Sequence, residues 1–66
     1  MADTELQIAA REVSNEKHAV LRQQALVLGL KGQGGPMLER ATELLESMRE
    51  ELILLEARLE RLVSKA

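Results

Sequence analysis

The chain has 66 residues and is at most one small domain; it has no cysteine and one histidine, which excludes disulfide bonds and the common zinc sites. With no aromatic residue, 45% hydrophobic residues and a net charge of −2, it lacks the rings and the positive charge typical of nucleic-acid platforms. A chain this short buries little surface, which leaves oligomerisation as its natural reinforcement.

The first residues, MADTELQIAARE, do not have the pattern of a secretory signal. They carry Asp3 and Glu5 where such a signal has basic residues. The longest run of apolar residues and glycine covers only residues 25–30, too few to cross a membrane. We therefore expect a cytoplasmic protein with no membrane segment.

The first expected element is a helix over about residues 4–30. Its apolar seam repeats every seven residues, at Leu6, Val13, Val20 and Val27. We expect Lys17 and Gln24 to occupy seam positions that a strict coiled coil would fill with apolar side chains. The aliphatic stem of Lys17 can lie along such a seam while its ammonium group reaches water.

A break follows at GLKGQGGP, residues 29–36, which holds all four glycines and the only proline. It predicts a turn over about residues 31–36. Gly32 is expected to cap the first helix in the left-handed conformation, which glycine adopts without strain. Pro36 suits the first turn of the next helix, where its missing N–H costs nothing.

The second expected element is a helix over about residues 37–64. The spacings between its apolar residues alternate between three and four over four heptads, which is the pattern of a coiled-coil seam. They are Leu38, Ala41, Leu45, Met48, Leu52, Leu55, Leu59 and Leu62.

The two helices are each about 40 Å long. A short turn between helices of equal length predicts an antiparallel pair. In that register Val27 meets Leu38 and Ala41, and Val20 meets Leu45 and Met48. Further from the turn, Val13 meets Leu52 and Leu55, and Leu6 meets Leu59 and Leu62. The predicted fold is thus all-α, a single coiled-coil-like helical hairpin over residues 1–66. A parallel coiled coil of the second helix, with the first detached, would set Glu51 against Glu56 and is disfavoured.

Several apolar residues remain outside the seam, although a helix in a simple hairpin needs only one apolar face. We interpret them as a partner interface, comprising Leu44, Ile53, Leu54 and Val63. The sequence therefore predicts a protein–protein interaction module. It either dimerises, forming a four-helix bundle, or docks on a helical partner.

Catalytic and ligand-binding patterns are weak. His18 has no cysteine or serine placed to act with it, and the glutamate pairs one turn apart lack a third ligand type. The loop KGQGG is not the phosphate-binding pattern GxxxxGK followed by Ser or Thr. We expect no enzyme activity, no catalytic residue, no cofactor, no metal and no small-molecule substrate.

One polar stripe on the first helix leaves a second function open. Arg11, Asn15, His18 and Arg22 share one helical face and would form a weakly basic surface in a dimer of hairpins. The RNA-binding protein Rop, a helical hairpin of similar length that dimerises into a four-helix bundle, is similar in general design. RNA binding is therefore an alternative to protein binding, although the net charge makes nucleic acid an unfavoured partner.

Residues 18–62 resemble a set of short uncharacterised bacterial proteins with a helix, a glycine turn, a leucine pair and a helix ending in RL. The matching residues are Gln23, Val27, Leu30, Gly32, Leu44, Leu45, Met48, Leu59, Arg61 and Leu62. This resemblance implies a helical hairpin and no particular activity. The pair Gly34 and Gly35 also resembles the turn of small co-chaperones of type III secretion needle subunits, which implies a co-chaperone role as a further alternative.

Overall fold

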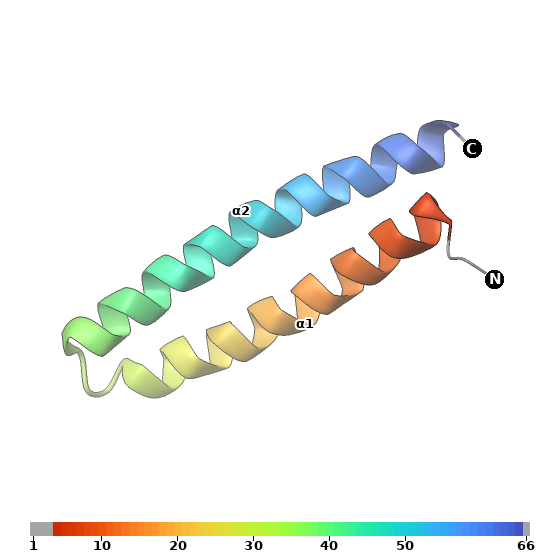
Figure 1. Cartoon of the computed structure of the whole chain (residues 1–66). Coiled ribbons are helices and arrows are strands. Elements are labelled where there is room, and N and C mark those ends of the chain that lie inside the picture. Colours follow the sequence, from red (N-terminus) through yellow and green to blue (C-terminus); the bar gives the residue numbers. More distant parts are fainter. Residues whose placement is uncertain (1–3, 66) are drawn as a thin grey trace.

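The computed structural model describes residues 4–65, which form two helices, α1 (Glu5–Leu30) and α2 (Gly35–Lys65). The helices lie side by side in opposite directions, with the turn at one end and both termini at the other (Figure 1). The predicted all-helical hairpin is confirmed. Helix α1 packs along α2, so the alternative with a detached first helix is not the fold of this chain.

Helix α1 begins with a reciprocal cap that joins Thr4 and Gln7. The Gln7 N–H donates to Thr4 Oγ1 at 3.1 Å, and the Thr4 N–H donates to Gln7 Oε1 at 2.9 Å. These two bonds satisfy backbone donors that have no partner within the helix. The cap fixes the start of the helix at Glu5 and contributes about 1 kcal/mol.

The turn between the helices differs from the prediction in its capping residue. The Lys31 N–H donates to the Val27 carbonyl at 3.1 Å, and the next bonds, from Gln33 and Gly34, both end on the Leu30 carbonyl. The left-handed conformation occurs at Gly34 and Gly35, with φ of 66° and 83°. The prediction that Gly32 supplies it was wrong, because these bonds prolong the helical winding and delay the reversal of the chain to the glycine pair.

Helix α2 begins two residues earlier than the sequence indicated, at Gly35, and ends at Lys65. Pro36 is its second residue. In the first turn of a helix the backbone N–H groups have no partner within the helix, so the missing N–H of proline costs no hydrogen bond there. The φ of proline also suits a helix, so the helix can start before it.

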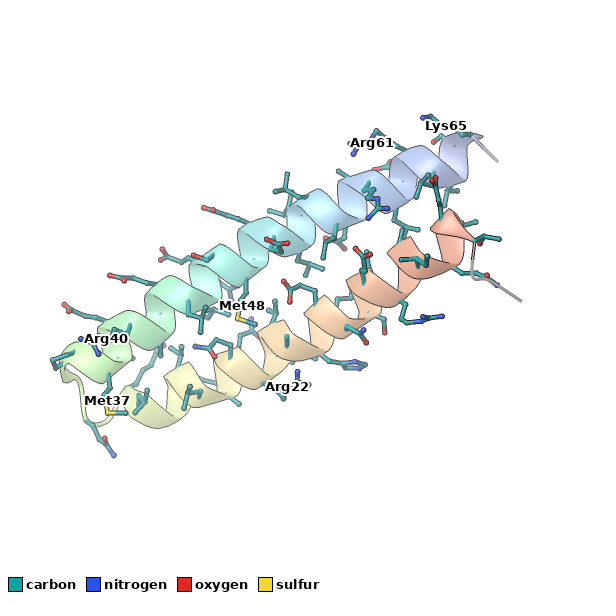
Figure 2. The ribbon with its side chains drawn as sticks, viewed as in Figure 1. Arg22, Met37, Arg40, Met48, Arg61 and Lys65 are labelled. Carbon is teal, nitrogen blue, oxygen red and sulfur yellow. The ribbon has the colours of Figure 1, made fainter. Side chains whose placement is uncertain are left out.

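The core lies between the helices and is thickest near the turn. Six of the described residues are buried: Ala9, Val13, Val20, Val27, Ala41 and Leu45. The other residues of the expected seam are half-buried: Leu6, Leu38, Met48, Leu52, Leu55, Leu59 and Leu62. Figure 2 shows the Met48 side chain reaching into the space between the helices. Each helix thus turns its seven-residue apolar repeat towards the other.

The polar residues of the α1 seam differ from those expected. Lys17 lies outside the seam, with 58% of its side chain exposed, and Gln24 is half-buried at the edge. Glu16 and Gln23, each three residues after a buried valine, occupy the second seam position. Gln23 Nε2 donates to the Ala41 carbonyl at 2.9 Å, so a hydrogen bond partly replaces apolar packing at this level.

Candidate interaction site

Two ion pairs mark the two sides of the seam. Arg58 Nη1 lies 3.4 Å from Glu12 Oε2, and Lys17 Nζ lies 3.9 Å from Glu56 Oε2. Arg58 precedes the seam residue Leu59 and Glu56 follows a seam residue, so these two positions flank the seam on opposite sides. We call these sides the Arg58 flank and the Glu56 flank. The four charged side chains are 40% to 58% exposed, and each pair contributes less than about 1 kcal/mol.

The four residues expected to form a partner interface are all exposed. The exposed fractions are 52% for Leu44, 64% for Ile53, 68% for Leu54 and 55% for Val63. Leu44 lies two heptads before Arg58, and is therefore on the Arg58 flank. Val63 lies one heptad after Glu56 and belongs to the opposite flank.

Ile53 and Leu54 are also separated, although they are neighbours in the chain. Leu54 follows Glu51 by three residues, and Glu51 is one heptad before Arg58. Ile53 follows Arg49 by four residues, and Arg49 is one heptad before Glu56. The structure therefore divides the expected interface into Leu44 and Leu54 on the Arg58 flank, and Ile53 and Val63 on the Glu56 flank.

A shallow apolar groove lies on the Arg58 flank beside the turn. Leu26 and Met37 are 50% and 67% exposed and stand on either side of it. Figure 2 shows Met37 and Arg40 near the turn end of α2. The groove is lined by Leu26, Leu30, Met37, Arg40, Ala41 and Leu44. Arg40 is its only charged residue. Sequence reasoning missed Met37, whose heptad relation to Leu44 is the signal that finds it.

The Glu56 flank has a more polar depression at the same level. Its apolar members are Val27, Leu28 and Leu45, and Leu28 is 66% exposed. Its polar members are Gln24, Lys31, Thr42 and Arg49. Apolar surface near the turn is therefore more continuous on the Arg58 flank.

The polar stripe of α1, formed by Arg11, Asn15, His18 and Arg22, is exposed along its length. Carboxylates lie beside it. Asn15 and Arg22 line a shallow depression together with Glu12, Glu16 and Glu51. This mixture of signs lowers the positive potential that a phosphate backbone would meet.

The described part of the chain forms neither a metal site nor a membrane-spanning helix. Residues 4–65 hold no cluster of three or more His, Cys, Asp or Glu placed to bind a metal ion. Neither described helix is long and apolar enough to cross a membrane. Comparison with protein-family models, curated proteins and solved structures finds no match to this chain.

Proposed function

We propose that the chain is a small interaction module in which two helical hairpins associate as a four-helix bundle. The observation that carries the proposal is the set of large apolar side chains left exposed on a hairpin with a thin core. Within residues 4–65, nine such side chains, Leu44, Ile53 and Leu54 among them, are each 39% to 68% exposed. Exposed leucines are common singly, but Leu26, Met37 and Leu44 line one groove, and a contiguous apolar patch on a small protein marks an interaction surface.

The accessible surface supports the same proposal. The chain exposes 5132 Å², whereas a compact folded protein of 7.4 kDa exposes about 4200 Å². The difference of roughly 900 Å² is close to the ~800 Å² that each partner buries in a standard interface. One further hairpin would therefore cover about as much surface as this elongated molecule exposes in excess.

The role proposed is binding rather than catalysis. RNA binding by the α1 stripe is the alternative, and its salt dependence is a separate test. Self-association is tested by thermal unfolding followed by circular dichroism at several protein concentrations. An associating protein melts at a temperature that rises with concentration, because mass action favours the folded oligomer. A melting temperature that does not change would contradict the proposal.

A further inference from the structure

One stripe of residues on the Arg58 flank of α2 is complementary to the same stripe of a second copy that runs in the opposite direction. Its members are exposed and follow one another at spacings of three and four residues: Met37, Arg40, Leu44, Ser47, Glu51 and Leu54. We call this set the α2 stripe. Spacings of three and four keep its side chains on one face of the helix over about 25 Å.

An antiparallel copy of the α2 stripe, centred between residues 45 and 46, meets it in complementary pairs. Met37 meets Leu54, which sets two apolar side chains together. Arg40 meets Glu51, an attractive pair of opposite charges. Leu44 meets Ser47, so a large side chain packs over a small one. All three pairs share one midpoint, and a two-fold axis there makes each pair occur twice.

We infer that a second copy of this chain docks on the α2 stripe about that two-fold axis, with Arg40 of each copy facing Glu51 of the other. The inference rests on the proposed function and specifies its surface and geometry. Within residues 4–65, Arg40 and Glu51 form no ion pair in the single hairpin, so both charges are available to the second copy.

The groove beside the turn gives Leu54 a place in this arrangement. Leu54 of the second copy lies opposite Met37, at the groove that Leu26 and Leu44 also line. Helices packed at the usual interaxial distance of 8–10 Å bring a leucine side chain into such a groove. Leu54 is the most exposed of the large apolar residues that the structure describes, at 68%, and its burial removes a large apolar area from water.

The Glu56 flank does not offer the same complementarity. An antiparallel copy centred on Ile53 would set Glu46 against Glu60, which is a like-charge contact. A copy centred between residues 54 and 55 would set Arg49 against Glu60, an attractive pair, but would leave the apolar Ile53 opposite the carboxylate of Glu56. Glu56 on that flank already pairs with Lys17 at 3.9 Å. An attractive charge pair and a matching apolar pair occur together only in the register of the Arg58 flank, and we therefore place the second copy there.

Charge-exchange variants test the pairing of Arg40 with Glu51 directly. The dimer dissociation constant is measured by sedimentation equilibrium of the full chain at low salt. Arg40→Glu and Glu51→Arg each create a like-charge contact twice, and each raises the dimer dissociation constant roughly tenfold. An equimolar mixture of the two single variants restores both attractive pairs and associates as a heterodimer with nearly wild-type affinity. The double variant Arg40→Glu with Glu51→Arg also restores both attractive pairs and associates as a homodimer with nearly wild-type affinity. Additive weakening in the double variant would overturn the inference.

Adjacent leucine and isoleucine residues provide a matched pair of variants. Leu54→Asp raises the dissociation constant at least about 100-fold, since it introduces two charges into apolar grooves. Ile53→Asp, on the other flank, changes it less than about threefold. A wild-type chain that stays monomeric would overturn the proposed function as well. A wild-type dimer that resists Leu54→Asp but dissociates with Ile53→Asp would overturn only the inference and move the interface to the Glu56 flank.

Discussion

The side-chain amide of Gln23 donates a hydrogen bond to the backbone carbonyl of Ala41, 2.9 Å away, and joins the two helices beside the core cluster. A glutamine within an apolar seam is costly to bury unless its polar atoms are satisfied. Here the bond links a seam position of α1 to the backbone of α2 at one level only, and so favours one register of the hairpin.

We predict that Gln23→Ala lowers the free energy of unfolding by about 1 kcal/mol, the usual contribution of one hydrogen bond. The matched control is Gln24→Ala, which makes the same chemical change at a half-buried position on the edge of the seam and should cost less. Urea unfolding of both variants measures the difference. Equal losses would show that the bond to Ala41 does not stabilise the hairpin.

The glycine pair at the turn yields a second prediction. Gly34 and Gly35 have φ of 66° and 83°, and alanine there costs about 1–2 kcal/mol each through backbone strain. Gly32 does not have positive φ, and a Cβ there would meet nothing within 4 Å. Gly32→Ala should therefore leave the free energy of unfolding within about 0.5 kcal/mol of wild type, or raise it. Thermal unfolding that ranks Gly32→Ala as the most damaging of the three would restore Gly32 as the cap.

A third prediction separates the seam from the outer surface. Leu52 packs against the core cluster, whereas Ile53 is 64% exposed. Leu52→Asp should cost about 2 kcal/mol or more and abolish most of the helical signal, because a charge enters the apolar seam. Ile53→Asp should keep that signal, measured by circular dichroism at equal protein concentration. Equal loss in both variants would contradict the assignment of the seam.

The RNA alternative has its own test on the α1 stripe. We expect no binding tighter than the weak non-specific level, about 10⁻⁴ to 10⁻⁶ M at physiological salt. The reason is that the carboxylates beside Arg22 lower the positive potential that a phosphate backbone would meet. Filter binding across a salt series, with Arg11→Ala and Arg22→Ala combined as the control, measures it. Nanomolar affinity for a structured RNA, lost in that double variant, would shift the function to α1.

The hairpin was predictable because its main signals are local and periodic. The seven-residue repeat of α1, which includes Val13 and Val20, and that of α2, which includes Leu45, predicted which face of each helix turns inwards. The glycines predicted the turn. The position of the left-handed glycines was missed because four glycines within seven residues offer several equivalent positions. Only the three-dimensional hydrogen bonds onto Leu30 decide among them.

The candidate interface was less predictable, because exposure alone does not assign a residue to a flank. Leu44, Ile53, Leu54 and Val63 are all apolar residues outside the seam, and the sequence pattern grouped them together. Their spacings from Arg58 and Glu56 separate them, and the two ion pairs show which side of α1 borders each flank once the helices are packed. Gln23 was equally hard to assign to the seam, since Gln24 beside it has the same chemistry.

The mass of the wild-type chain in solution tests the central claim of self-association most directly. Sedimentation equilibrium at micromolar concentration should give a dimer, with twice the 7.4 kDa of one chain. Dilution should shift that mass towards the monomer, because association follows mass action. A mass of 7.4 kDa at every concentration, with a fully helical spectrum, would show that the hairpin is stable alone and would contradict the claim.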